Sequence, residues 1–274
     1  MAAQLCVADP ARSEAVADRE PLGGIVPHAG WICSGAIAGE VLATIARGVT
    51  PDVVVVFGAV HTPFDLDVAA LDSHERWLEP GGESPVASDV AVRLRESTDG
   101  LFAVDDRFHA DEHAVEVELP LIQVVWPAAR VLPVEVPPTD DAVAIGRRTA
   151  EAVRQCGVAR VMYLASSDLT HYGPAYRFAP AGVGPVGLTW AKDNDRRLLD
   201  VVTDLRAERV VPDARAHASA CGPGAIAAML AACREHGAAR ATVLRHANSC
   251  ETLARVAPQP PDNAVGYAGV VVTT

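Results

Sequence analysis

Short apolar runs of strand length alternate with helical segments along most of this chain, and this alternation constrains the fold more than any other feature. Residues 53–57, for example, form an unbroken run of valines that ends in phenylalanine, as in a buried strand. We expect strands near residues 24–27, 53–57, 67–71, 130–136, 160–164, 241–246 and 266–272. We expect helices near residues 34–47, 88–96, 112–125, 141–155, 188–205 and 223–236. Strands that alternate with helices need crossover connections, so the sequence predicts an α/β fold around a mainly parallel sheet covered on both faces.

The length and composition fit a folded chain with a large core. The protein has 274 residues, of which 50% are hydrophobic and 21% charged, far from the composition of a disordered chain. No repeat and no long linker divides it, and the Pro/Gly-rich stretch 179–187 is expected to be a loop. We therefore predict one domain over residues 23–274, preceded by a partly ordered N-terminal arm over residues 1–22.

Charge and cysteine content exclude several classes of partner. The net charge of −12 repels nucleic acids and anionic membrane surfaces. No apolar run approaches the roughly 18 residues of a membrane span. Residues 1–10 lack the basic segment and apolar core of a secretory signal. We therefore expect a cytoplasmic location. The six cysteines are scattered without a CxxC pair, which predicts reduced thiols rather than a disulfide framework.

Polar residues follow three of the predicted strands. His28 comes after the first, His61 after the second, and Asp168 and His171 after the strand near residues 160–164. The carboxyl ends of parallel strands meet at one edge of a sheet, where ligand crevices form. A single histidine there is commonly a solvated or hydrogen-bonded residue, and Asp168 suits a turn, but the repetition favours one shared site.

Cys221 lies directly before an Ala-rich segment, with Pro223 suited to a first helical turn. A thiol at a helix N-terminus has a lowered pKa, which favours a thiolate that ligates a metal or acts as a nucleophile. The alternative is a small buried apolar side chain.

Two further motifs have weaker support. His109, Glu112 and His113 match H-x-x-E-H, in which two histidines one helical turn apart hold zinc and the glutamate acts as a base. Pro120 interrupts the expected helix, and the alternative keeps His113 and Glu116 facing a substrate. Residues 182–187 match G-x-G-x-x-G, but no strand precedes them closely, so we interpret the match as chance.

Five motifs in order resemble the Memo family, whose members are also called AmmeMemoRadiSam system protein B and are similar in fold to class III extradiol ring-cleavage dioxygenases. The motifs are Pro-His-Ala-Gly-Trp at 27–31 followed by Ser-Gly at 34–35, Phe-Gly-Ala-Val-His at 57–61, Asp-Glu-His-Ala-Val-Glu at 111–116, Ser-Ser-Asp-Leu-Thr-His-Tyr-Gly at 166–173 and Ala-Cys-Gly at 220–222. The resemblance implies a three-layer α/β sandwich. It also implies metal ligands at His28, His61 and Cys221, with Asp168, His171 and His113 around the open coordination positions.

The chain departs from the family pattern at two places. The usual N-terminal Ala-Gly-aromatic-aromatic-Pro segment is absent, and the usual Gly-Pro-Ser-His-His becomes Gly58-Ala59-Val60-His61-Thr62. Ring-cleaving relatives bind Fe(II) through two histidines and one carboxylate. A thiolate from Cys221 as the third ligand also suits copper or zinc.

These observations lead to one hypothesis and two alternatives. The hypothesis is a mononuclear non-haem Fe(II) dioxygenase that acts with O₂ on a small phenolic or catechol-like substrate. His171 or His113 would take and return the substrate proton, and Asp168 would orient an imidazole. Substrate contacts are assigned to Trp31, Tyr172, Trp190 and Glu116. The alternatives are a zinc-dependent hydrolase using the H-x-x-E-H motif and a non-catalytic Memo-like binding protein; a homo-oligomer is compatible with each.

Overall fold

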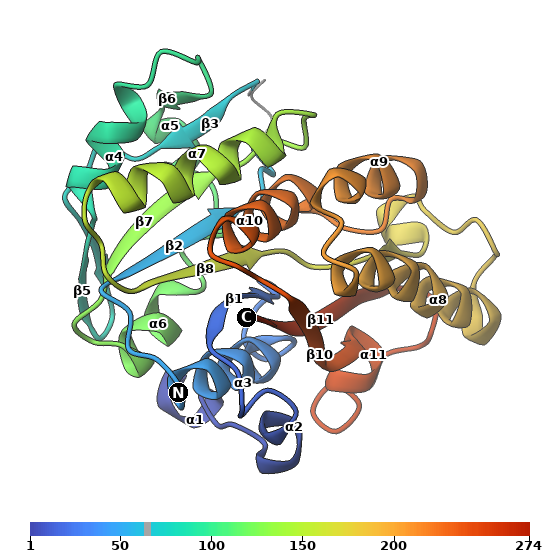
Figure 1. The fold of residues 1–274 in the computed structure, drawn as a ribbon. Coiled ribbons are helices and arrows are strands. Elements are labelled where there is room, and N and C mark those ends of the chain that lie inside the picture. The colour runs from blue at the N-terminus through green and yellow to red at the C-terminus, as the bar shows by residue number, and fades with distance from the viewer. Residues whose placement is uncertain (63–66) are drawn as a thin grey trace.

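A single mixed sheet runs through the centre of the protein (Figure 1). The computed structural model describes residues 1–62 and 67–274. The strand order is β10-β11-β1-β8-β2-β7-β3-β6, and the short strand β9 pairs with β11 beside this path. Helices cover both faces, so the expected three-layer α/β class is confirmed.

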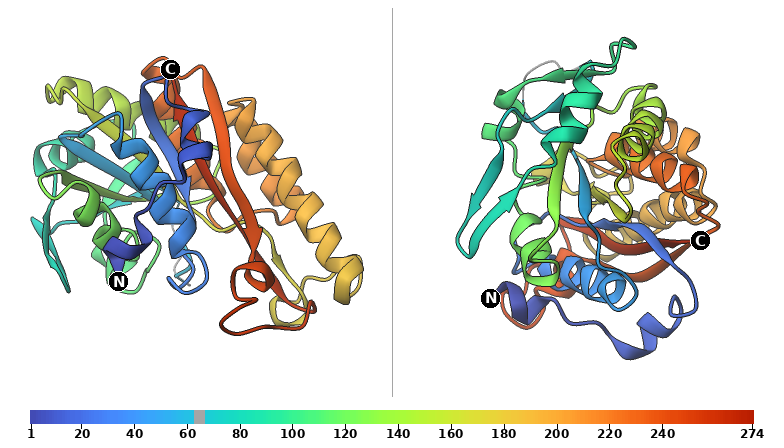
Figure 2. Two further views of the ribbon diagram at one scale, coloured as in Figure 1. Left: turned by 90° about the horizontal axis from the view of Figure 1, so that it is seen from below. Right: turned by 60° about the vertical axis from the view of Figure 1, so that its left-hand side comes forward.

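The centre of the sheet is parallel and its margins contain antiparallel pairs. The parallel core consists of β1 (Pro21–Val26), β8 (Val161–Ser166), β2 (Val53–Gly58) and β7 (Arg130–Glu135). The other strands are β3 (Ala69–Leu71), β6 (Phe102–Val104), β9 (His171–Tyr172), β10 (Arg240–Asn248) and β11 (Ala264–Thr273), with the separate hairpin β4 (Arg76–Glu79) and β5 (Gly82–Pro85). Figure 2 shows the long β10–β11 pair with a helix along one side.

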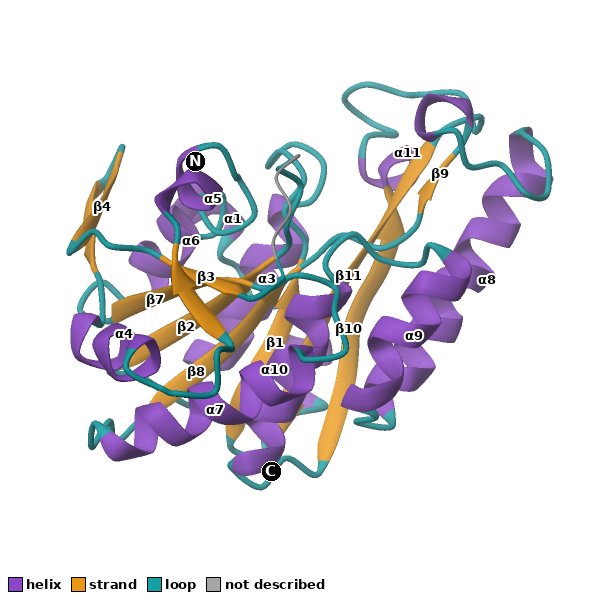
Figure 3. Cartoon of the chain, turned by 90° about the horizontal axis from the view of Figure 1, so that it is seen from above, coloured by secondary structure: helices purple, strands orange, loops and turns teal. Residues whose placement is uncertain are grey.

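The helices form two layers. One face of the sheet carries α4 (Ser88–Arg95), α7 (Ala142–Gln155), α8 (Gly184–Thr203), α9 (Ala207–His217) and α10 (Pro223–Glu235). The other carries α1 (Ala2–Leu5), α3 (Gly35–Ala46) and α6 (Leu119–Val125). Short helices complete the chain: α2 (Pro10–Glu14), α5 (Asp106–Ala110), the 3₁₀ helix η1 (Pro174–Tyr176) and α11 (Ser249–Thr252). Figure 3 shows the sheet between α7 and α10 on one side and α3 on the other.

Strand β2 shows why this sheet needs two layers of helices. Val53, Val55 and Phe57 pack into the core beneath α7 and α10, whereas Val54 and Val56 pack into the core beneath α3 and α6. Successive side chains of a strand point to opposite faces, so a continuous apolar run requires cover on both sides.

Three predicted boundaries are wrong in detail. The helix expected over residues 112–125 begins only at Leu119. Residues 114–118 form turns instead, and the Glu112 carboxylate accepts hydrogen bonds from the backbone N–H groups of His113 and Ala114. The helix expected from residue 188 begins at Gly184, inside the expected loop. The first strand begins at Pro21, ahead of the expected residue 24.

The N-terminal segment lies against the body of the protein. Helix α1 packs against α3 and α6, and Arg12 of α2 forms an ion pair with Glu40 of α3. In the described part of the chain, no helix is long and apolar enough to cross a membrane. None of the six cysteines forms a disulfide.

Candidate metal centre

The three strand-end motifs meet at one edge of the sheet. Strands β1, β8 and β2 are parallel neighbours in that order, and His28, Asp168 and His61 follow them within two or three residues. The peptide N–H of His28 donates to Asp168 Oδ1 at 3.0 Å. The convergence expected from the sequence therefore rests on adjacent strands.

Three imidazoles form the centre of the site. His28, His61 and His113 each offer a ligand atom, and these atoms lie within 4.8 Å of one another. The ring centroids are 5.0 Å apart for His28 and His61, 5.3 Å for His28 and His113, and 4.9 Å for His61 and His113. Such a group is suited to hold a metal ion.

Oxygen atoms fix the orientation of all three rings. Glu112 Oε1 lies 2.9 Å from His61 Nδ1 and 3.3 Å from His113 Nδ1. His28 Nδ1 lies 3.0 Å from Ser166 Oγ, which in turn donates to Glu118 Oε1 at 3.4 Å. With each Nδ1 engaged in this way, each ring is left with Nε2 for a ligand, as in histidines that bind metals.

Cys221 lies beside the three imidazoles. Its Sγ is 3.2 Å from His28 Nε2 and accepts the peptide N–H of Asp168 at 3.2 Å. Burial first, and then the Asp168 carboxylate, raise the pKa of the Cys221 thiol, so the lowered pKa expected from its place before α10 is wrong. A protonated thiol donating to His28 Nε2 fits this contact, and a cation would replace that proton to form a thiolate ligand.

The pKa values of His28 and His113 shift in opposite directions. Burial lowers the pKa of His28 to about 3, with further lowering by His61 and His113. The hydrogen bond to Glu112 raises the pKa of His113. Burial alone would raise the pKa of Glu112, but hydrogen bonds with His113 and His61 lower it below its usual range. His28 is therefore a neutral imidazole, the form that binds a metal.

Asp168 organises backbone rather than an imidazole. Its buried carboxylate accepts the peptide N–H of His28, and its own carbonyl accepts the peptide N–H of Cys221 at 3.2 Å. Burial raises the pKa of Asp168 to about 7. The expected orientation of the imidazoles is supplied instead by Glu112 and Ser166.

His171, on β9, lies at the side of this group. Its Nε2 is buried and has no hydrogen-bond partner among the described residues, and burial lowers its pKa, with further lowering by His61. Together with Cys221, it lines a cavity of about 400 Å³. The cavity thus reaches the thiol of the candidate centre.

The four predicted substrate contacts are not among the described residues that line this cavity. Trp31 donates from Nε1 to the Val117 carbonyl at 3.0 Å, and the buried Tyr172 donates to the Gly182 carbonyl at 2.9 Å. Trp190 packs against Phe178 with ring centroids 5.6 Å apart, and Glu116 is exposed. Tyr176 and Phe178 line the cavity beside His171.

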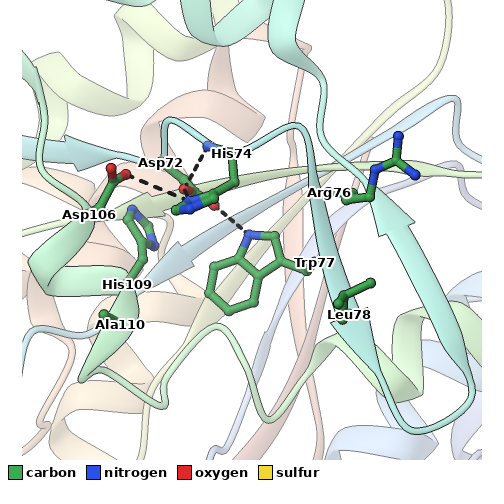
Figure 4. Close-up of a pocket in the computed structure, with 8 residues that line it drawn as sticks. All are labelled: Asp72, His74, Arg76, Trp77, Leu78, Asp106, His109 and Ala110. Atoms are coloured by element: carbon green, nitrogen blue, oxygen red, sulfur yellow. Dashed lines mark hydrogen bonds and ion pairs between the residues drawn. The ribbon is translucent and has the colours of Figure 1, made fainter.

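The structure separates the histidines of the H-x-x-E-H match. Helix α5 ends at Ala110, so His109 and His113 do not share one helical face. His109 instead lines a second cavity with Asp72, His74, Asp106 and Trp77, as Figure 4 shows.

A second group of possible metal ligands lies in that cavity. It comprises Asp72, His74 and Asp106. Each carboxylate already has close partners, with Asp72 accepting from Trp77 Nε1 at 2.6 Å and contacting His74 Nδ1 at 2.7 Å, and Asp106 accepting from Ser73 Oγ at 2.7 Å. Hydrogen bonds are therefore enough to explain why these three side chains lie close together.

The residues that orient the rings are the part of the site that sequence reasoning misses. The sequence suggests Glu112 only as a zinc-peptidase base, and it suggests no role for Ser166 or Glu118. The only sequence signal for Glu112 and Ser166 is their place in the Memo-like motifs. Glu112 contacts His61 across 51 positions of the chain, and Ser166 contacts His28 across 138 positions.

Comparison with known proteins identifies the family of the chain and a related fold. The sequence model of the family described as Memo-like protein matches residues 4–271. The chain belongs to the Memo family. Among Memo relatives, a MEMO1 family protein of Methanosarcina mazei is 32% identical over 94% of this chain and 88% of its own, and one of Methanosarcina acetivorans is 33% identical with the same coverage. The crystal structure of uncharacterized protein JW3007 from Escherichia coli K12 aligns with a TM-score of 0.55 at 13% identity, over 92% of this chain and 100% of that one, a likeness of fold.

Proposed function

We propose that this Memo family protein is a metal-dependent oxidoreductase, a mononuclear non-haem Fe(II) dioxygenase acting with O₂ on a small phenolic or catechol-like substrate. The observation that carries the proposal is the group of three imidazoles, each oriented through Nδ1, beside a thiol that lines a cavity. An oriented ligand set next to open space is what a catalytic metal site requires.

The residues present fit a metal ion. We assign His28, His61 and Cys221 as ligands, with His113 as the neighbour able to complete or replace one of them. Nitrogen and sulfur donors suit Fe(II), copper and zinc, and the resemblance to extradiol enzymes favours Fe(II). When bound, Fe(II) would supply positions for substrate and O₂ and the electrons that O₂ activation needs.

His171 is the proposed proton acceptor. Its buried, unpartnered Nε2 and lowered pKa make it a neutral imidazole with a free nitrogen at the cavity, among the residues that the structure describes. It would accept the proton of a substrate hydroxyl and return it later, as general acid–base catalysis requires. The rings of Tyr176 and Phe178 would hold the substrate ring, with Trp190 packed behind Phe178.

The test begins with the metal content of protein purified without oxygen. We expect iron in the wild type, its loss in His28→Ala and Cys221→Ser, and its retention in His74→Ala, which alters only the second ligand group. His171→Gln should keep the iron but reduce oxygen uptake with a catechol panel by roughly 10²- to 10⁴-fold.

One result would exclude the proposed dioxygenase, and another would exclude only the role of His171. One is absence of oxygen uptake by iron-loaded protein across the catechol panel, combined with unchanged metal content in His28→Ala. The other is a His171→Gln variant with undiminished uptake, which would remove the proposed proton acceptor. Metal binding through His28 without any oxygen uptake would instead support the non-catalytic alternative.

A further inference from the structure

The cavity that reaches Cys221 also contains a cationic side chain. Arg177 lines it together with His171, Tyr176 and Phe178. No aspartate or glutamate is among the described residues that line it. The cavity therefore combines an aromatic wall, an imidazole and one guanidinium in a protein whose net charge is −12.

The guanidinium of Arg177 is free to bind a ligand. Among the described residues it has no ion pair and no side-chain hydrogen bond, although its backbone N–H donates to the Pro174 carbonyl at 3.1 Å. By contrast, other arginines, such as the half-buried Arg148 and the exposed Arg160, pair with carboxylates. An exposed, unpaired arginine in a cavity whose described lining contains no carboxylate is suited to bind an anion.

The backbone around the cavity is held in unusual conformations. Arg177 has a φ of 53° and Ala218 a φ of 48°, in the left-handed region that side chains other than glycine rarely adopt. Of the three such residues in the described chain, these two line the same cavity. Arg177 ends the 3₁₀ helix η1 and Ala218 ends α9, each in the left-handed conformation that is common where a helix ends, so the helix end at Arg177 sets the direction in which its side chain leaves the backbone.

We infer that Arg177 binds a carboxylate group carried by the aromatic substrate. The aromatic ring of this ligand rests on the proposed function, whereas its carboxylate rests on Arg177 and the cavity lining alone. One guanidinium presents a planar fork that matches a carboxylate and balances a single negative charge. A phosphate ester carries up to two charges, and the described lining offers no second arginine or lysine. The negative charge of the whole protein disfavours anions elsewhere on the surface, so Arg177 also acts as a local attractor.

The experiment compares two ligands of nearly equal shape, 4-hydroxybenzoate and 4-hydroxybenzamide, by titration calorimetry on the purified protein. We expect the wild type to bind the acid at least about tenfold more tightly than the amide. Arg177→Gln should bind both equally, and Arg177→Lys should retain part of the preference. Arg240→Gln serves as the matched control, because Arg240 is exposed where β10 begins, at the opposite edge of the sheet, and should leave the preference unchanged.

Several outcomes would overturn the inference. They are equal affinity for acid and amide in the wild type, no detectable binding of either, or an acid preference that survives in a folded Arg177→Gln variant. Tighter binding of phenyl phosphate than of benzoate would indicate that the ligand group bound by Arg177 is a phosphate and not a carboxylate. A thermal melt of each variant separates a folding defect from a lost contact.

The test does not depend on iron or turnover. An acid preference that follows Arg177, in a protein that neither binds iron nor consumes oxygen, would contradict only the proposed oxygen chemistry. Iron binding and oxygen uptake with equal affinity for acid and amide would contradict only the role of Arg177.

Discussion

A buried carboxyl group at the end of β7 shows how single residues shape this site. Glu135 is fully buried, and neither carboxyl oxygen has a hydrogen-bond partner among the described residues. Burial, with a contribution from Glu112, raises its pKa well above the usual range. A Cβ at Gly58 would lie 2.0 Å from Glu135 Oε2, so the strand that leads to His61 needs glycine there.

Replacing this carboxyl group should change how stability depends on pH. Below the ordinary pKa of 4.5, Glu135 is protonated in both the folded and the unfolded state. As pH rises, the unfolded state loses the proton first, so the wild type loses stability up to the folded-state pKa. We expect Glu135→Gln to be more stable relative to wild type at about pH 7 than at about pH 4.5, by roughly 1 kcal/mol or more.

Urea unfolding at the two pH values measures this difference. The exposed Glu116→Gln is the control and should change the free energy of unfolding little at either pH. A Glu135→Gln effect that is the same at both pH values would contradict a buried, protonated carboxyl group.

At the scale of elements, the contact between α7 and α10 determines how closely the helices cover the sheet. Gly146 of α7 faces the backbone of α10, and a Cβ at this position would lie 2.0 Å from the Ala228 carbonyl oxygen. Helix α10 is buried along almost its whole length. A glycine inside a helix costs free energy relative to alanine, so its place here reflects the close approach of the two helices.

Gly146→Ala should therefore destabilise the protein by about 1–3 kcal/mol, although alanine is the better helix former. The change in the free energy of unfolding can be measured with urea. Gly30→Ala is the matched control, because no described atom lies within 4 Å of the place that a Cβ would occupy there, and we expect a change within about 0.5 kcal/mol. Equal effects of the two substitutions would remove the steric explanation.

The sequence predicts an element well when the contacts that form it join residues close in the chain, and poorly when they join distant residues. The valine run of β2 identifies a doubly covered strand without further information, because alternation along a strand is local. The segment after Glu112 has helical periodicity, yet residues 114–118 form turns, and the Glu112 carboxylate contacts the backbone N–H groups of His113 and Ala114 and the ring of His61. The contact with His61 exists only after β2 and this segment have come together, so no local pattern reveals it.

The same distinction applies to the candidate site. Strand-end positions are enough to predict that His28, His61 and Asp168 meet, since parallel strands share an edge. The sequence suggests a substrate wall only from aromatic residues near the motifs, and the structure instead brings Tyr176, Phe178 and Arg177 to the cavity. Loop side chains follow no period, and their directions depend on backbone conformations such as the positive φ of Arg177.

At the scale of the whole molecule, a cation at the candidate centre would connect segments that are distant in sequence. His28 follows β1, His61 follows β2, and Cys221 precedes α10, so that 193 positions separate the first of these ligands from the last. A ligand that binds only the folded state stabilises it in proportion to the logarithm of its concentration. Metal binding should therefore be visible as a rise in the unfolding temperature, independent of any reaction.

We expect Zn²⁺, chosen because it has no redox chemistry, to raise the unfolding temperature by several degrees at about a hundredfold excess over its dissociation constant, which corresponds to roughly 2.7 kcal/mol. His28→Ala should remove most of this shift, because it deletes the imidazole that contacts the Cys221 thiol. His74→Ala should keep it, because Asp72 and Asp106 are already hydrogen-bonded and His74 is largely exposed. The opposite pattern, with the shift lost in His74→Ala and kept in His28→Ala, would locate the cation in the Asp72, His74 and Asp106 group and separate it from the cavity that reaches Cys221.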